Sequence, residues 1–235
     1  MRMKLPDFLD LAGVSRLPVS YKDSLVSAVG GFLGILGILL MSQWLLGEDF
    51  PVLIVPSLGA SAVLLFASPH VPFAQPWNLV GGHAISAIVG VACWQWIPDY
   101  VIAASASVGI AIGLMYLARC THPPGGATAL AAVIGSEQLH RLGYAYEFEP
   151  VMLNVLTILA VAVAFNALFH WRRYPAWLQQ RAARGTPPEG YPPIAHEDFV
   201  YALSQLDTFV DVTEEDLLEI YRLATRRHVQ REQVG

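Results

Sequence analysis

Charge is almost absent from a long stretch of this sequence. Between Ser24 and Ala118 there is no Lys or Arg, and the acidic residues are Glu48, Asp49 and Asp99. Only 14% of all residues are charged and 54% are apolar, whereas a soluble domain carries about a quarter charged residues. Charge-free apolar runs of about 18 residues or more are typical of membrane spans. The composition therefore excludes an ordinary soluble protein. The net charge of −5 comes from the loops and the tail, so it indicates no nucleic-acid partner.

Cysteines and reactive side chains are also scarce. Cys93 and Cys120 lie in or beside apolar segments, and their spacing fits neither a metal site nor a disulfide framework. No nucleophile–base pair or metal-binding cluster is recognisable, so we expect no enzyme, no metal and no cofactor. The first apolar segment, about 23 residues, is too long for the core of a signal peptide. Acidic residues in the arm before it argue against an organellar transit peptide.

Six apolar segments are present, over about 24–46, 51–68, 79–98, 100–118, 122–136 and 150–171. At about 1.5 Å per residue, the first, third, fourth and sixth can cross a core of ~30 Å, the fourth barely. The second carries Pro51 and Pro56, and the fifth opens on Pro123-Pro124-Gly125-Gly126. These two are either short broken spans or re-entrant segments. The sequence thus predicts an all-α polytopic membrane protein.

Basic residues indicate the topology. They occur before the first segment at Arg2, Lys4, Arg16 and Lys22, and after the last at Arg172 and Arg173. Both termini are therefore expected in the cytoplasm, which requires an even number of crossings. Six crossings place Arg119 inside and the acidic loops outside, and only Arg141 breaks this pattern. Four crossings would place both Arg119 and Arg141 outside and the Asp99 turn inside. We favour six, with an N-terminal arm over 1–23, a transmembrane domain over 24–171 and a helical cytoplasmic tail over 172–235. The expected location is a bacterial inner membrane.

An internal repeat is suggested by two similar stretches. Pro56-Ser57-Leu58-Gly59-Ala60-Ser61-Ala62-Val63 matches Pro123-Pro124-Gly125-Gly126-Ala127-Thr128-Ala129-Leu130, 67 residues further on. Six segments then divide three plus three, and an odd number of crossings per half makes the repeat inverted. GxxxG spacings at Gly30/Gly34 and Gly109/Gly113 extend the correspondence. The alternative is that small-residue helices resemble one another by composition.

Paired interrupted helices point to a substrate site in a transporter. The first N–H groups of a helix lack partners and carry partial positive charge, so two facing helix starts can bind a small anion. Glycine permits close approach, and Ser61 and Thr128 add hydroxyl donors. No Asp or Glu lies inside the six segments, which argues against a cation site. The candidate anion-binding residues are Ser57, Gly59, Ala60, Ser61, Asn78, His83, His122, Gly125, Gly126, Ala127 and Thr128.

Several of these polar residues have a structural alternative. His122 can hold the Pro-Pro turn, and His83 and Asn78 can join helices by hydrogen bonds. A histidine that titrates near its reference pKa of about 6.5 could instead couple transport to protons.

The motifs resemble those of a known family. Thr121-His122-Pro123-Pro124-Gly125-Gly126-Ala127-Thr128-Ala129-Leu130 is similar to the signature of the HPP family of integral membrane proteins. The earlier Pro56 stretch and Gln75-Pro76-Trp77-Asn78-Leu79-Val80-Gly81-Gly82-His83 resemble two further segments of that family, in the same order. The resemblance covers about residues 50–135. It implies transport of small inorganic anions, with nitrite the substrate associated with plastid and cyanobacterial members.

The tail has a different composition from the rest of the chain. Residues 184–193 are rich in Gly and Pro and read as a linker. Helical patterns follow at about 196–207 and 214–230. A segment this short cannot form a core alone, so it packs on the membrane domain, joins copies into a homo-oligomer, or stays solvated. A second function is therefore a non-transporting membrane scaffold or sensor that signals through the tail.

Overall fold

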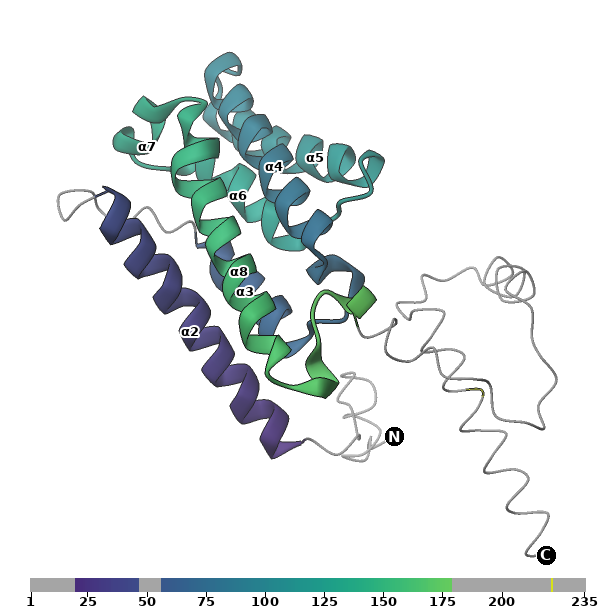
Figure 1. Ribbon diagram of the computed structural model, residues 1–235. Coiled ribbons are helices and arrows are strands. Elements are labelled where there is room, and N and C mark those ends of the chain that lie inside the picture. The colour runs from purple at the N-terminus through teal and green to yellow at the C-terminus, as the bar shows by residue number, and fades with distance from the viewer. Residues whose placement is uncertain (1–19, 47–55, 179–220, 222–235) are drawn as a thin grey trace, which may run out of the picture.

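The structure is a computed structural model that describes residues 20–46, 56–178 and 221. Every regular element in these residues is helical, which confirms the predicted all-α class (Figure 1). The elements are α2 (Tyr21–Leu46), α3 (Ser57–Ala67), the 3-10 turn η1 (Pro72–Ala74), α4 (Pro76–Trp96), α5 (Tyr100–Leu117), α6 (Pro123–Ile134), α7 (Glu137–Leu142), the π-helical turn η2 (Glu147–Met152), α8 (Leu153–Ala167) and the 3-10 turn η3 (His170–Arg172). Of the two predicted tail helices the structure describes Tyr221 alone, which is helical, and Pro51 lies outside the described residues.

Four helices are long and apolar enough to cross a membrane. They are Tyr21–Leu45, Pro76–Trp96, Tyr100–Leu117 and Pro150–Ala167. These correspond to the first, third, fourth and sixth apolar segments, as the sequence predicts. The second and fifth segments form the shorter apolar helices α3 and α6. The sixth segment begins irregularly, because Pro150 lies inside the π-helical turn that precedes α8.

Proline and glycine set the bounds of α6. His122, just before α6, is extended, and Pro123 and Pro124 occupy the first turn, where a missing N–H costs no hydrogen bond. Gly135 is extended again and ends the helix. With 11 residues in α3 and 12 in α6, each helix is about 17–18 Å long, roughly half of a ~30 Å hydrocarbon core.

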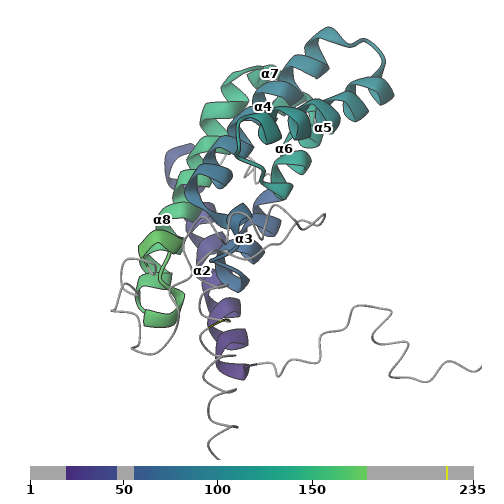
Figure 2. The ribbon, with the colours of Figure 1, turned by 90° about the vertical axis from the view of Figure 1, so that its right-hand side faces the viewer.

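The helices pack in two groups. One group consists of α2, α3 and α8, and the other of α4, α5 and α6 (Figures 1 and 2). Contacts between α3 and α6 and between α4 and α8 join the groups. The third helix of each half of the chain therefore packs on the first two helices of the other half.

Hydrogen bonds gather several segments at one end of the molecule, called here the Arg172 end. The indole of Trp171 donates to Asp23 at the start of α2 (2.9 Å), and the Tyr174 hydroxyl donates to the Ala74 carbonyl beside the start of α4 (2.6 Å). The start of α4 also lies beside the end of α5, because the Trp77 indole donates to the carbonyl of Ala118 (3.2 Å).

The opposite end, called here the α7 end, is formed by the end of α4, the start of α5 and α7. The ring of Trp94 on α4 stacks on that of His140 on α7, with centroids 4.2 Å apart. Asp99, between α4 and α5, accepts a hydrogen bond from the Ile102 amide and so caps α5 (2.8 Å). The six apolar helices thus alternate in direction between the two ends.

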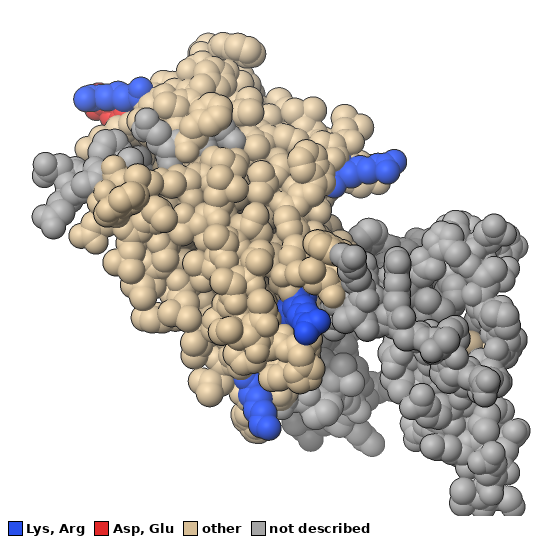
Figure 3. All heavy atoms as spheres, in the orientation of Figure 1, with Lys and Arg blue, Asp and Glu red and all other residues tan. Residues whose placement is uncertain are grey.

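Charged side chains avoid the apolar body between these ends. Figure 3 shows a surface with few charges, on which Lys and Arg side chains stand at the edge and at the lower part. Lys22 begins α2 and Arg119 follows α5, so both belong to the Arg172 end. Glu137 and Arg141 pair with each other on α7 at 2.7 Å.

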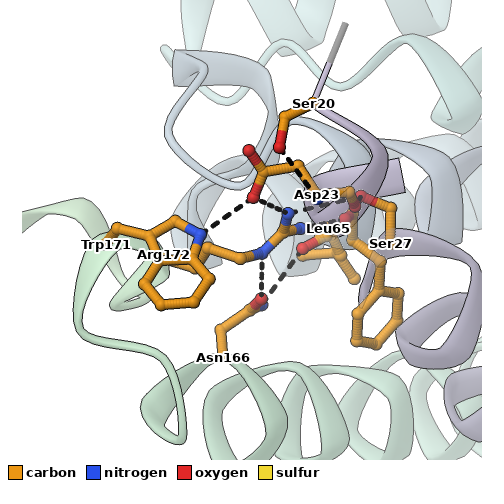
Figure 4. A network of polar contacts seen from close by, with 8 residues as sticks. Ser20, Asp23, Ser27, Leu65, Asn166, Trp171 and Arg172 are labelled. Carbon is orange, nitrogen blue, oxygen red and sulfur yellow. Dashed lines mark hydrogen bonds and ion pairs between the residues drawn. The ribbon is translucent and has the colours of Figure 1, made fainter. Parts of the chain in front are cut away.

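Arg172 is the buried exception, and it caps the end of α3 (Figure 4). Its side chain is 6% exposed. Its guanidinium donates to the carbonyl of Phe66, to the Ser27 hydroxyl (3.3 Å) and to Asn166 Oδ1 (3.4 Å), and lies 3.8 Å from Asp23. Burial lowers the pKa of Arg172, and the Asp23 carboxylate opposes that shift. A cation is favoured at a helix C-terminus, so Arg172 fixes α3 from its far end.

Candidate functional site

Five of the eleven predicted site residues meet in one buried cluster. They are Ser57 and Ser61 on α3, His83 on α4, His122 just before α6, and Thr128 on α6. Ser57 is 2% exposed and the other four are 0% exposed. Each lies within hydrogen-bond distance of another member, so the cluster is a single network that joins three helices.

The contacts between α3 and α6 fix how these helices lie. Ser57 Oγ is 2.7 Å from Thr128 Oγ1, and Ser61 Oγ is 2.8 Å from His122 Nε2. A later position on α3 therefore meets an earlier position on α6, so the helices run antiparallel. Their N-terminal halves lie side by side, and their amide ends point toward opposite ends of the molecule.

His83 bridges the two short helices from α4. Its Nε2 is 2.9 Å from Ser61 Oγ, and its Nδ1 is 2.7 Å from Thr128 Oγ1. The rings of His83 and His122 are tilted by 58° to each other, with centroids 4.9 Å apart. Both nitrogens of each ring therefore have a partner, as buried polar atoms require.

One carbonyl sets the direction of these hydrogen bonds. His122 Nδ1 is 2.7 Å from the Phe73 carbonyl, which can only accept, so Nδ1 carries the proton. In the neutral ring Nε2 must then accept, and the Ser61 hydroxyl donates to it. Because Ser61 has one proton, His83 Nε2 must donate to the Ser61 oxygen.

The same reasoning continues to the start of α3. With Nε2 protonated, His83 Nδ1 accepts from the Thr128 hydroxyl, and Thr128 Oγ1 accepts from the Ser57 hydroxyl. All protons of the neutral cluster thus point one way. The chain runs from Ser57 through Thr128, His83, Ser61 and His122 to the Phe73 carbonyl.

Glycines allow α4 and α6 to approach closely beside the cluster. A Cβ on Gly82 would lie 2.5 Å from the Cβ of His122, and one on Gly125 would lie 2.8 Å from Ser86 Oγ. Such distances leave no room for a side chain. Gly125, a predicted site residue, therefore packs against α4 next to the cluster.

The other predicted residues lie elsewhere. The Asn78 amide donates to the Thr121 carbonyl (2.9 Å) and so joins α4 to the loop before α6. Gly59 and Gly126 have no crowded neighbour, since a Cβ on Gly126 would meet Val108 at 3.8 Å and one on Gly59 would meet nothing within 4 Å. Ala60 and Ala127, which directly follow these two glycines on α3 and α6, are exposed.

Two groups around the cluster were not predicted from the sequence. Tyr146 is fully buried, and its hydroxyl donates to the Thr128 carbonyl (3.4 Å). The Phe73 carbonyl, which orients His122, belongs to the backbone, so no side-chain pattern could reveal it. His70, which follows α3 in the sequence and is not part of the cluster, contacts the Arg173 carbonyl (3.3 Å).

The cluster is made of neutral hydrogen-bonding groups. The hydrogen bonds described for its five side chains go to one another and to backbone groups, without a carboxylate, ammonium or guanidinium. In the part of the chain that the structure describes, no group of three or more His, Cys, Asp or Glu could hold a metal ion. Hydroxyls and imidazoles of this kind can accept and donate protons and can bind a small anion.

Long apolar helices, a pair of short interrupted ones and charge confined to the ends define a polytopic α-helical membrane protein. The model of the HPP family's transmembrane region matches residues 16–175, so the chain belongs to the HPP family. Two proteins of Dictyostelium discoideum, named only as transmembrane proteins, are each 39% identical, over 155 and 128 residues. These alignments cover 64% and 53% of this chain but 50% and 45% of the relatives, so the chain spans about half their length. No solved structure matches it.

Proposed function

We propose that this chain is a membrane channel or transporter for a small inorganic anion, with nitrite as the first substrate to test. The observation that carries the proposal is the meeting of α3 and α6. Two interrupted helices of half-membrane length lie side by side around a buried, uncharged, hydrogen-bonding cluster. In transporters, interrupted helices of this kind form substrate sites.

The chemistry of the cluster favours an anion over a cation. Ser57 is the first residue of α3 and His122 immediately precedes α6, so the cluster lies at the positive ends of two helix dipoles. Hydroxyl and imidazole groups supply donors without a fixed positive charge. An anion held by dipoles and hydrogen bonds can leave again, as conduction requires.

The packing supports the inverted repeat that such a transporter needs. Exchanging the halves of the chain replaces α2, α3 and α4 by α5, α6 and α8. Under this exchange the pairs α2–α3, α2–α8 and α3–α8 become α5–α6, α5–α4 and α6–α4, which are also in contact. The pairs α3–α6 and α4–α8 map onto themselves. Ser61 and Thr128, which hold equivalent places in the two matching stretches, both belong to the cluster.

Charge supports a cytoplasmic location for the Arg172 end. Lys22, Arg119, Arg172 and Arg173 all belong to that end. The positive-inside rule then gives six crossings with both termini inside. A bacterial inner membrane stays our prediction for the location.

Flux through the purified protein in proteoliposomes tests the proposal. Nitrite, nitrate, chloride and formate are offered in turn, and we expect saturable flux of at least one. Thr128→Val keeps the shape but removes a hydroxyl, and a hydrogen bond to a charged group is worth roughly 1.5–3 kcal/mol. Binding of the transported anion should therefore weaken roughly ten- to hundred-fold if that hydroxyl contacts it.

Ser107→Ala is the matched control. Its hydroxyl is also fully buried, but it donates to the Ala104 carbonyl of its own helix, α5. Flux through this variant should equal that of the unaltered protein. Absence of flux for every anion of the panel would reject the proposal and favour a scaffold or sensor.

A further inference from the structure

The two hydroxyls that touch the histidines each have a second acceptor. Ser61 Oγ lies 3.3 Å from the Ser57 carbonyl, and Thr128 Oγ1 lies 3.5 Å from the Pro124 carbonyl. In both cases the carbonyl is four residues earlier in the same helix. A rotation about one side-chain bond can therefore redirect either hydroxyl proton from a histidine nitrogen to the backbone.

These spare acceptors make room for one extra proton. If a proton binds at His83 Nδ1, the Thr128 hydroxyl turns to Pro124 and its oxygen accepts from the ring. If it binds at His122 Nε2, the Ser61 hydroxyl turns to the carbonyl of Ser57. In each case the proton comes from water, the ring gains one positive charge, and every N–H keeps an acceptor.

The cluster accommodates one such proton rather than two. With the ring centroids 4.9 Å apart, charging both histidines would place like charges side by side in a buried site. Besides the histidines, the titratable side chain described in contact with the cluster is Tyr146, which directly precedes η2 and donates to the Thr128 carbonyl. The Cys120 side chain lies beside Gly81 of α4. No ionisable side chain of α3 or α5 contacts the histidines among the described residues.

An anion and this proton favour each other's binding. Both ends of the hydrogen-bond chain lie at helix N-termini, where the macrodipole opposes a cation and attracts an anion. An anion bound at these helix starts offsets the charge of the imidazolium, and the imidazolium strengthens the hold on the anion. Such coupling is reciprocal: each ligand raises the affinity for the other by the same factor.

We propose that the His83–Ser61–His122 chain is a proton-binding site and that the protein carries one proton together with each anion. This inference rests on the proposed anion transport and specifies it as electroneutral symport. The proton is taken up from one side when the anion binds and is released when the anion leaves.

Proteoliposomes that contain a pH-sensitive dye and nitrite outside test the coupling. The membrane potential is set with valinomycin and potassium, and protein-free vesicles are subtracted to remove diffusion of nitrous acid. Symport predicts that nitrite entry acidifies the lumen and is unaffected by the potential. Raising the pH on both sides by one unit should slow entry by up to about tenfold where the proton site is unsaturated.

Two substitutions remove the proton site while retaining part of each histidine's hydrogen bonding. His83→Gln keeps a donor for Ser61, and His122→Asn keeps a donor for the Phe73 carbonyl. Because either histidine can take the extra proton, the double variant should abolish proton movement, and any nitrite flux that remains in it should follow the membrane potential. His140→Gln is the matched control, because His140 lies at the α7 end against Trp94, and it should behave as the unaltered protein.

These experiments distinguish a failure of the proposed symport from a failure of the proposed anion transport. Nitrite flux through the unaltered protein that follows the potential and moves no protons overturns the symport and leaves anion transport standing. If neither nitrite nor any other anion of the panel crosses, the proposed function fails. Nitrite-induced proton uptake by the detergent-purified protein in weak buffer then decides whether the proton site exists. Uptake of about one proton per molecule, lost in the double variant His83→Gln with His122→Asn, supports the proton site, whereas no uptake overturns the proton site as well.

Discussion

Ser61 is the residue on which both histidines of the cluster depend. Its oxygen accepts from His83 and its hydroxyl donates to His122, at 2.9 and 2.8 Å. All three side chains are 0% exposed, so water does not replace a lost partner at the surface. A buried donor left without an acceptor costs about 1–3 kcal/mol.

Ser61→Ala should therefore destabilise the protein by about 1–3 kcal/mol, measured as a lower midpoint of thermal unfolding in detergent. Ser105→Ala is the control, because that exposed hydroxyl donates to the Val101 carbonyl within α5. Its midpoint should not change. Equal midpoints for the two variants would contradict the network of hydrogen bonds described for Ser61.

Gly82→Ala tests the close approach of α4 to the cluster. The new methyl group would lie 2.5 Å from the Cβ of His122 and 3.1 Å from the Cys120 carbonyl. Neither atom is the end of a flexible chain, so we expect a loss of about 1–3 kcal/mol, as for an overpacked core.

Gly31→Ala on α2 is the matched control, because its Cβ would meet nothing within 4 Å. Alanine in an open helical position stabilises by about 0.5–1 kcal/mol in water, so no loss is expected. The comparison is made by thermal unfolding in the same detergent. A Gly82→Ala protein as stable as Gly31→Ala would show that α4 and α6 are farther apart than described.

Helical geometry explains which site residues could be predicted. Ser57 and Ser61 are four residues apart and share one face of α3, whereas Gly59 and Ala60 in the same motif point elsewhere. The sequence motif marks the right helix but not its buried face. Tyr146 could not be predicted, because its position depends on the path of the chain through η2.

At the scale of elements, α3 is held at both ends by different kinds of contact. Its start meets α6 through Ser57, and its end meets Arg172, which donates to the carbonyl of Phe66 (Figure 4). The sequence predicts Arg172 only as a topology signal. Its burial against three helices follows from the fold, because Phe66 and Asp23 lie far from Arg172 in the sequence.

Arg172→Gln should loosen α3, because it removes the charge at its C-terminus and leaves the carbonyl of Phe66 without its guanidinium donor. We expect a loss of about 1–3 kcal/mol in thermal unfolding. Arg173→Gln is the matched control, since the neighbouring side chain is exposed. If both variants unfold at the same temperature, Arg172 does not stabilise α3.

The two GxxxG motifs differ in their surroundings although their spacing is the same. Cβ atoms on Gly30 and Gly34 would lie 2.6 and 2.5 Å from the ring of Phe66, so α2 packs tightly on α3 there. Cβ atoms on Gly109 and Gly113 would meet nothing within 4 Å. The motif therefore indicates close packing in one half only, because its effect depends on which face of the helix meets a neighbour.

At the scale of the whole molecule, the two ends differ in charge as the proposed topology requires. Lys22 and Arg119 lie at the Arg172 end, and Asp99 lies at the α7 end. The hydropathy of the sequence predicts the six helices and the four long spans. It does not predict that α4 packs on α5 and α6 or that α8 packs on α2 and α3, because these contacts join residues far apart in the chain.

Accessibility labelling of single cysteines tests this topology in the membrane. Cys93 and Cys120 are both free and buried, so they are first replaced by alanine to give a background without thiols. Lys22→Cys and Arg119→Cys should then react with an impermeant maleimide from the side of the N-terminus. Asp99→Cys and Glu137→Cys should react only from the opposite side. If Arg119→Cys reacts from the same side as Asp99→Cys, α5, which lies between these two residues, does not cross the membrane. The inverted repeat would then be excluded, because α2–α4 and α5–α8 could no longer cross in opposite senses.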